Sequence, residues 1–301
     1  MNFIIRYGNP QISLDVTQLT FDKCMKNNVI RIPRGQAQKN ALFTDPDKDQ
    51  VKVINIYNLL THSLSVHHDS KDVYIDLNTN AVFDLDEYED KLFSIQKSLK
   101  IDYGSFRDEL PEQLMAVRNL KGVEKVLEIG GNIGRNSLII ASILKNHGGQ
   151  LVSIECDQAV ALQLQYNRDL NGLEFAVEAS ALSKRKLIQH KWNTIESEVL
   201  LEGYTPVSSI TYAELMKKYN IAFDTLVLDC EGAFYYILKD TPEILDNITL
   251  IIIENDFVDI NNKLYVNEVL ESRGFKVVYT ESLSVPTPLP CQENFFEVWK
   301  K

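Results

Sequence analysis

The 301-residue sequence has no long hydrophobic run and few cysteines. No stretch approaches the roughly 18 to 20 consecutive apolar residues that a membrane-spanning helix needs. The first residues lack the apolar core and small-residue cleavage site of a signal peptide. Cys24, Cys156, Cys230 and Cys291 are scattered without a CxxC pair, which argues against a structural zinc site and a disulfide framework. We therefore expect a soluble, cytoplasmic protein with reduced thiols.

The sequence also has fewer basic than acidic residues. The sequence has 31 Lys and Arg against 42 Asp and Glu, a formal net charge of −11. Residues 1–120 carry 14 basic and 17 acidic side chains, and the remainder carries 17 and 25. Binding to a phosphate backbone requires a basic stripe that neither part offers. We therefore expect no nucleic-acid partner and no binding to anionic membranes.

The pattern of apolar residues changes near residue 120. Before it, short apolar segments separated by polar turns predict strands or single helical turns at Val51–Leu60, Asp72–Leu77 and Ala81–Leu85. Apolar residues at steps of three and four predict a helix over Asp84–Lys100. A second helix is expected over Pro111–Asn119, where proline suits the first turn. We expect the first 119 residues to form a small α+β extension or lid with a role in substrate recognition.

After residue 120, apolar strands alternate with helices. Strands buried on both faces read as continuous runs of Val, Ile and Leu, as in Phe223–Leu228 and Thr249–Ile253. This alternation predicts a Rossmann-like, doubly wound α/β domain over residues 120–301. The other predicted strands are Val123–Ile129, Leu151–Ile154, Phe175–Val177, Phe275–Tyr279 and Asn294–Trp299, and the predicted helices are Arg135–Asn146, Gln158–Leu170, Ser209–Tyr219 (with a short strand edge at its start) and Lys263–Arg273.

The first strand of this domain ends in a glycine-rich turn. Gly130 and Gly131 let the backbone turn sharply beside a ligand, and Gly134 lets the next helix pack on the strand. Ligands bind beyond the carboxyl ends of the strands in such a sheet. The turn is not the GxGxxG pattern that seats a pyrophosphate. S-adenosylmethionine (SAM) has no phosphate but carries an ammonium, for which Glu128 is a suitable partner. A tight turn with a solvated acid is the alternative interpretation.

The second strand also ends in an acid, Glu155. A carboxylate at this position accepts hydrogen bonds from both hydroxyls of a ribose, and it would suit NAD as well as SAM. Each turn alone is a weak signal. The ordered pair, separated by one helix, favours a nucleoside cofactor.

Two later strands end in clustered oxygen ligands. Asp229 and Glu231 follow one strand, and Glu254 and Asn255 follow the next. Two acids at one strand tip repel each other unless a cation or a proton is shared. Asp229, Glu254 and Asn255 could together hold a hard cation such as Mg²⁺. The alternative interpretation is that Glu231 caps the following helix.

With these residues in view, residues 120–300 resemble the FkbM family of SAM-dependent methyltransferases. The segments that carry the resemblance are Val126-Leu127-Glu128-Ile129-Gly130-Gly131-Asn132-Ile133-Gly134, Ala181-Leu182-Ser183, Leu228-Asp229-Cys230-Glu231-Gly232-Ala233 and Leu270–Val277, with Glu155 and Glu254 in order between them. Glu128, Gly131 and Cys230 depart from the usual Asp, Ala and aliphatic residues.

The resemblance implies a class I methyltransferase fold with a seven-stranded sheet whose last strand is antiparallel. It implies that SAM is bound by Glu128, by Glu155, by Ala181 and by the glycine-rich turn, which includes Asn132. It also implies O-methylation of a sugar, glycan or other small hydroxylated metabolite.

Transfer of a methyl group to a hydroxyl requires a residue that orients the acceptor and takes its proton. Asp229 is the first candidate for this role, with Glu231 assisting, and His190 is an alternative base. Two other functions compete: a nucleic-acid methyltransferase, which predicts a basic strip, and a non-catalytic SAM-fold binding protein, which predicts a damaged cofactor turn.

Overall fold

The computed structural model describes residues 2–191, 193–283 and 288–301. The chain forms two compact units, residues 1–93 and 94–301. The sequence predicts a domain boundary between residues 119 and 120, whereas the structure divides into its two units within α3 (Glu87–Ser98). The segment after α3 belongs to the second unit because Lys100 and Asn171 exchange two hydrogen bonds of 2.7 Å, and because α4 (Leu110–Asn119) packs on α5 (Arg135–Leu144).

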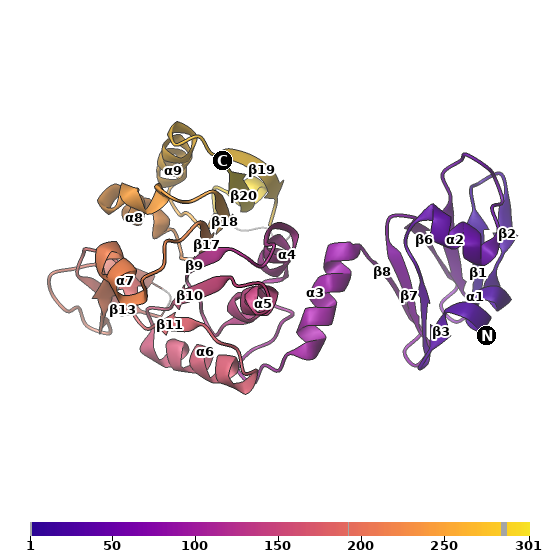
Figure 1. The fold of residues 1–301 in the computed structure, drawn as a ribbon, viewed down its shortest axis with the longest axis horizontal. Helices are drawn as coiled ribbons and strands as arrows, with labels where there is room; N and C mark the ends of the chain where they lie inside the picture. Colours follow the sequence, from indigo (N-terminus) through magenta and orange to yellow (C-terminus); the bar gives the residue numbers. More distant parts are fainter. Residues whose placement is uncertain (1, 192, 284–287) are drawn as a thin grey trace. The chain divides into compact units, whose positions relative to one another are not determined.

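The first unit contains two four-stranded antiparallel sheets, two short helices and the start of α3, coloured from indigo to purple in Figure 1. The first sheet has the order β2-β1-β5-β6 and the second the order β3-β4-β7-β8. Alternation places Phe3, Ile5 and Tyr7 of β1 in the buried core. The elements are β1 (Phe3–Gly8), β2 (Ser13–Asp15), α1 (Thr17–Cys24), β3 (Met25–Lys26), β4 (Val29–Ile32), α2 (Gln36–Phe43), β5 (Val53–Asn58), β6 (Ser63–His68), β7 (Asp72–Asp76) and β8 (Ala81–Leu85).

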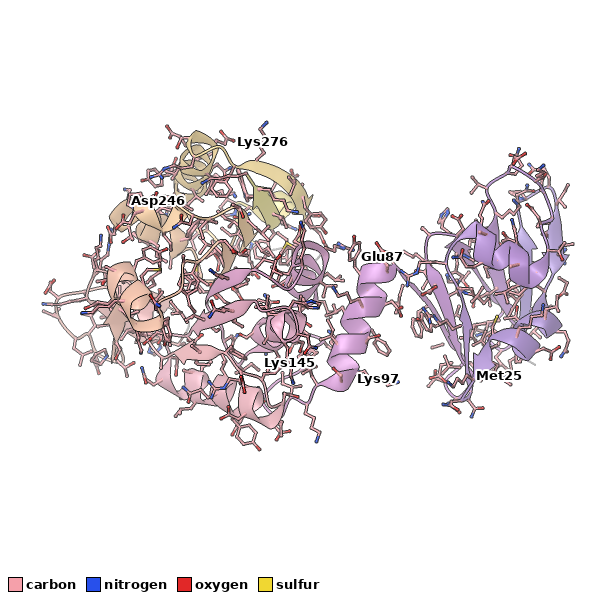
Figure 2. All side chains as sticks on the ribbon, in the orientation of Figure 1. Met25, Glu87, Lys97, Lys145, Asp246 and Lys276 are labelled. Carbon is pink, nitrogen blue, oxygen red and sulfur yellow. The ribbon has the colours of Figure 1, made fainter. Side chains whose placement is uncertain are left out.

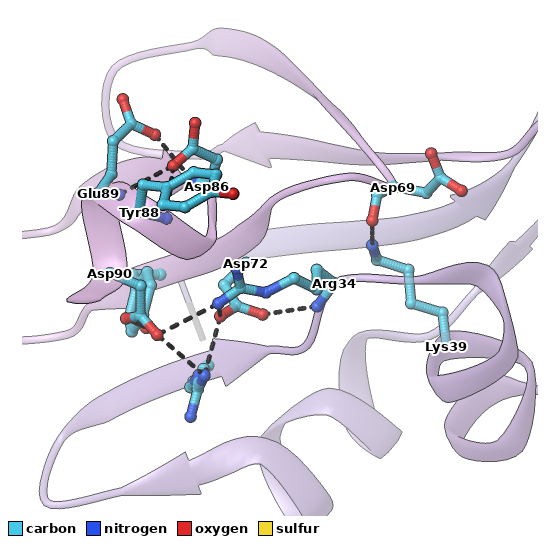
Figure 3. A network of polar contacts seen from close by, with 10 residues as sticks. Arg34, Lys39, Asp69, Asp72, Asp86, Tyr88, Glu89 and Asp90 are labelled. Carbon is cyan, nitrogen blue, oxygen red and sulfur yellow. Dashed lines mark hydrogen bonds and ion pairs between the residues drawn. The ribbon is translucent and has the colours of Figure 1, made fainter. Parts of the chain in front are cut away.

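A polar network fastens the start of α3 to the second sheet (Figure 3). The Asp72 carboxylate is buried and binds the guanidinium groups of Arg31 at 2.8 Å and Arg34 at 2.7 Å. Both arginines also contact Asp90 on α3, at 3.3 and 3.2 Å. Removal of Asp72 would leave two neighbouring positive charges without their closest partner.

The second unit is built on seven strands in the order β11-β10-β9-β17-β18-β20-β19. All neighbours are parallel except at β20, which runs antiparallel to both β18 and β19. This confirms the predicted Rossmann-like sheet with one antiparallel strand, the arrangement of class I methyltransferases. The strands are β9 (Lys125–Ile129), β10 (Gln150–Ile154), β11 (Ala176–Glu178), β17 (Thr225–Leu228), β18 (Leu250–Glu254), β19 (Lys276–Glu281) and β20 (Phe296–Lys300).

Helices cover both faces of this sheet, and their side chains fill the space against it (Figures 1 and 2). Apolar residues of α7, α8 and α9 join those of the central strands in one core cluster, for example Leu215, Phe234 and Val266. The remaining helices of the unit are α6 (Gln158–Leu170), α7 (Tyr212–Tyr219), α8 (Phe234–Asp240) and α9 (Ile260–Ser272), and single 3-10 turns lie at Pro242–Leu245 and Gln292–Asn294.

A small antiparallel sheet interrupts the domain between β12 (Ala181–Leu182) and β16 (Ser209–Ile210), which pair with each other. Its strands are β13 (Leu187–His190), β14 (Asn193–Glu196) and β15 (Thr205–Val207). Over the part of the chain that the structure describes, no helix is long and apolar enough to span a bilayer.

Candidate functional site

The carboxyl ends of the central strands bring the predicted site residues to one edge of the sheet. β9 lies between β10 and β17, and β17 lies beside β18. Because these four strands are parallel, the turns that follow them meet at the same edge. Glu155, Asp229 and Glu254 therefore lie at neighbouring strand ends.

The glycine turn after β9 packs tightly against the end of β17. Gly130 has φ +91°, and a Cβ atom added there would lie 1.5 Å from the backbone oxygen of Asp229. A Cβ atom on Gly131 would lie 2.1 Å from Ser153 Oγ. The amides of both glycines donate to the Ile154 carbonyl, at 3.0 and 2.8 Å. Glycine is required here because any side chain would displace the neighbouring strand ends.

Glu155 accepts hydrogen bonds from two backbone amides, one in the glycine turn after β9 and one in the segment after β10. Its Oε2 accepts from the Asn132 amide at 2.9 Å, and its Oε1 accepts from the Asp157 amide at 2.8 Å. Burial raises the pKa of this carboxyl above its usual value. The carboxyl group is therefore fixed at the end of β10 next to the glycine turn.

Glu128 is an acid inside the domain, with 2% of its surface exposed. Ser137 Oγ donates a hydrogen bond to its carboxylate. Burial is the main cause that raises the pKa of Glu128 to about 7, and the negative charges of Glu109 and Glu155 contribute to this value. An ionised Glu128 in this position would be stabilised by a bound cation.

A cavity joins Glu128 to the glycine turn and to Asp229. The residues that line it are Glu109, Glu112, Glu128, Gly130, Gly131, Asn136, Val227 and Asp229. Two buried oxygen atoms on its wall, Glu112 Oε2 and Asn136 Oδ1, have no hydrogen-bond partner within the described residues. The wall thus presents carboxyl and amide oxygens to whatever fills the cavity.

Asp229 and Glu254 both have strongly raised pKa values. Burial raises the pKa of Asp229 well above its usual range, and the charges of Glu109, Asp256, Glu112 and Glu231 add to this. Burial raises the pKa of Glu254 to about 11, with a hydrogen bond to Glu112 as the next cause. Burial and the neighbouring acids therefore favour the protonated, uncharged forms of Asp229 and Glu254 in the ligand-free protein.

Sequence reasoning missed Glu109, Glu112 and Asp256. The two glutamates belong to the start of α4, which follows no strand, so only the packing of the helix places them at the site. Asp256 ends the predicted cluster after β18, and its Oδ1 accepts from the Gly232 amide at 2.7 Å. Burial raises the pKa of Asp256 to about 7.

One of the predicted metal ligands, Asn255, makes a contact with another segment of the chain. The Asn255 side chain is buried and donates to the Asn294 carbonyl at 2.7 Å, so it fastens β18 to the segment before β20. Among residues 2–191, 193–283 and 288–301, no three His, Cys, Asp or Glu side chains are placed to hold a metal ion. The Mg²⁺ site predicted from Asp229, Glu254 and Asn255 gains no support from this arrangement.

The structure also shows the surroundings of three other residues named from the sequence: Glu231, Ala181 and His190. Glu231 is exposed, with φ +51°, and does not cap α8, whose N-cap Ala233 makes no side-chain bond. Ala181 lies in β12, and its amide donates to the Ser208 carbonyl at 2.7 Å. His190 is exposed on β13, and its Nδ1 lies 2.7 Å from the Gly203 carbonyl.

A buried asparagine ties the segment after α3 to the glycine turn. Asn167 of α6 is fully buried, and its Nδ2 donates to the carbonyls of Ile133, at 2.9 Å, and Tyr103, at 3.2 Å. Its Oδ1 accepts from the amides of Asp102, at 3.1 Å, and Tyr103, at 3.3 Å. One side chain therefore positions both the turn and the segment beside it.

Comparison with known proteins gives distant similarity in structure alone. No family model and no curated protein matches the sequence. A putative O-methyltransferase from Klebsiella pneumoniae is 15% identical, with a TM-score of 0.39 over 72% of this chain and 90% of that chain. Fibrillarin from Aeropyrum pernix, in complex with SAM, is 10% identical, with a TM-score of 0.42 over 77% and 94%. A putative tRNA (m1A22) methyltransferase from Streptococcus pneumoniae is 11% identical, with a TM-score of 0.40 over 62% and 67%. These similarities are too distant to assign a family or an acceptor.

Proposed function

We propose that this protein is a SAM-dependent methyltransferase that methylates a hydroxyl group of a sugar, glycan or other small hydroxylated metabolite. The observation that carries the proposal is the glycine turn, which packs on the end of β17 and binds the Glu155 carboxylate through the Asn132 amide. Glu128 and Asp229 lie on the wall of the small cavity next to this turn. Its sheet has the strand order and the single antiparallel strand of class I methyltransferases.

The residues present fit SAM better than a dinucleotide. A pyrophosphate would be repelled by Glu109, Glu112 and Asp229 on the cavity wall. SAM carries an ammonium and a sulfonium, and both positive charges are stabilised by carboxylates. We assign its amino-acid end to Glu128 and the turn Gly130–Gly134, and its ribose hydroxyls to Glu155. Ala181 follows β11 in the chain and is assigned to the rest of the nucleoside.

When bound, SAM supplies an electrophilic methyl group. The protein must then orient the acceptor hydroxyl and take its proton. We assign both tasks to Asp229, because it lines the cavity and ends a strand next to the glycine turn. A positive charge in the cavity would favour its ionised form, and this carboxylate would take the proton that the acceptor hydroxyl loses. Glu231, two residues on, assists in holding the acceptor.

A nucleic-acid acceptor fits this site less well. The net charge of −11 and the acids of the cavity wall would repel a phosphate backbone. A non-catalytic binding protein would not need Asp229 at the cavity. Both alternatives predict no methyl transfer to small hydroxylated compounds.

Calorimetry with SAM is the first test. We expect binding in the micromolar range, and the absence of binding at high micromolar SAM would refute the proposal. Replacing Glu155 by Gln keeps its shape but removes the charge that holds the hydroxyls. We expect binding to weaken roughly 10- to 100-fold, as for the loss of one hydrogen bond to a charged group. Glu271→Gln on the exposed side of α9 is the matched control and should bind SAM like the wild type.

A further inference from the structure

The cavity at the glycine turn is too small for the cofactor that we assign to it. Its volume is about 10 Å³, which is room for about one water molecule. Sites that bind small molecules and cofactors enclose roughly 300 to 1,000 Å³. Part of the cavity wall must therefore move before SAM can lie beside Glu128 and the turn.

One part of this wall is not fixed by the central sheet. The ends of β9 and β17 and the first turn of α5 supply most of the wall, and Glu112 belongs to α4. Glu109 differs because it ends the segment between α3 and α4. The structure describes this segment, residues 99–109, in full, and it contains no helix or strand. We refer to residues 102–109 as the strap.

The strap lies directly on the glycine turn. A Cβ atom added to Gly104 would lie 2.1 Å from Ile133 Cδ1, so the strap backbone touches the turn at this point. The Glu109 carboxylate lies 2.6 Å from a guanidinium nitrogen of Arg135 and 3.5 Å from Asn132 Nδ2. Because Glu109 also lines the cavity, the strap covers the turn on the side that the cofactor must reach.

Polar contacts rather than a buried core hold the strap in place. None of its residues is buried. Asn167 binds the first two residues of the strap through three hydrogen bonds of 3.1 to 3.3 Å, and Gln113 donates to the Asp108 carbonyl at 2.8 Å. Glu109 has φ +59°, a left-handed conformation that is unfavourable for a residue with a side chain. Such a segment opens locally at a lower cost than the packed sheet.

We propose that the strap is a gate over the cofactor site, which must move away from the glycine turn before SAM binds and which the ion pair between Arg135 and Glu109 holds closed. This inference rests on the proposed methyltransferase function and names how access to the same site is regulated. The ammonium of SAM is an alternative partner for the Glu109 carboxylate, so the cofactor favours release of the strap. Binding is slowed in proportion to the fraction of molecules whose strap is closed.

The association rate of S-adenosylhomocysteine, which keeps the ammonium of SAM, tests the gate. Surface plasmon resonance with the immobilised whole protein measures this rate. Arg135→Gln removes the ion pair but keeps an N–H donor. We expect association to become about tenfold faster, because a hydrogen bond between charged groups no longer favours the closed strap.

Arg273→Gln is the matched control, since Arg273 forms an ion pair of 2.9 Å with Asp246 at the start and end of other elements, away from the strap. It should leave the association rate of the wild type unchanged. A rate for Arg135→Gln that equals or falls below that of the wild type would overturn the proposal.

A milder variant at the other end of the strap gives a second measurement. Tyr166→Phe keeps the ring contact with Tyr103, at a centroid distance of 5.4 Å, but loses the hydrogen bond of 3.1 Å to Asp102. We expect association about threefold faster than in the wild type, as for the loss of one neutral donor. The ring that packs on the strap stays in place, so this variant keeps the fold of α6.

Hydrogen–deuterium exchange shows whether the strap itself is what opens. The amides of Asp102 and Tyr103 donate to Asn167, and Arg135→Gln should speed their exchange by the same factor as the association rate. Unchanged exchange at these amides would contradict the gate. Failure of every variant to bind S-adenosylhomocysteine refutes the methyltransferase function, whereas binding at a rate that neither Arg135→Gln nor Tyr166→Phe changes refutes the gate alone.

Discussion

Replacement of Glu128 by Gln should stabilise the ligand-free protein at alkaline pH. Burial raises the pKa of this carboxyl from 4.5 to about 7. In the unfolded chain the group ionises near 4.5, whereas the folded protein holds the proton until pH approaches 7. The folded state is therefore favoured fully below pH 4.5, and this contribution is lost as pH rises to about 7.

The size of this effect follows from the two pKa values. Their difference of about 2.5 corresponds to about 3 kcal/mol of unfolding free energy at 1.36 kcal/mol for each pKa unit. Glutamine has no proton to lose and keeps an oxygen for the bond from Ser137. The variant should match the wild type near pH 4.5 and exceed it by about 3 kcal/mol at pH 8.5.

Urea unfolding followed by tryptophan fluorescence measures this difference. Trp299 is buried in β20 of the second unit, so its signal reports on the unit that contains Glu128. Glu271→Gln serves as the control and should show no pH-dependent difference from the wild type. A gap between the Glu128 variant and the wild type that does not change with pH would refute the reasoning. The same variant should bind SAM more weakly at pH 8.5, so its stability and affinity should change in opposite directions.

Further predictions test the turn, the catalytic assignment, the metal hypothesis and the first unit. Gly130→Ala should destabilise the second unit by about 3 kcal/mol or more, whereas Gly148→Ala, with positive φ but open space around it, should cost about 1 kcal/mol; similar urea midpoints for the two would contradict the tight packing of the turn. Asp229→Asn should abolish methyl transfer but spare SAM binding in calorimetry, and unchanged turnover would remove Asp229 from the chemistry. Activity should survive EDTA, because no three His, Cys, Asp or Glu side chains of the described residues are placed to hold a metal ion; loss of activity that Mg²⁺ restores would revive the metal site. Asp72→Asn should destabilise the first unit by about 2 to 3 kcal/mol in circular-dichroism melts, since two partly exposed arginines lose their shared carboxylate; a change below about 0.5 kcal/mol, typical of a neutral surface site, would refute this.

Local sequence signals were sufficient to predict those helices and strands whose structure depends on their own segment alone. The helix predicted over Gln158–Leu170 has those bounds in the structure. Thr211 caps α7, and Glu214 completes a capping box. The apolar runs before Asp229 and Glu254 form β17 and β18, because strands buried on both faces leave a continuous hydrophobic pattern.

The features that escaped prediction depend on contacts between distant segments. β1 and β6 were not predicted as strands, since two of the six residues of β1 and four of the six of β6 are exposed and the apolar pattern is interrupted. β13 was not predicted either, since it has only four residues and its apolar pair Leu187 and Ile188 is followed by polar side chains. Glu109 and Glu112 became site residues only through the packing of α4 beside the strand ends, which no local pattern encodes.

Asn167 has a practical consequence for dissecting this protein. A truncation that begins at residue 120 would remove Asp102 and Tyr103, and with them three of the four hydrogen bonds of the Asn167 amide. It would also delete the helix that carries Glu112 into the cavity wall. A truncation that begins at residue 94 keeps all of these contacts. The sequence assigns the stretch between the two cuts to the N-terminal extension, yet the smallest fragment that can retain an intact glycine turn must include it.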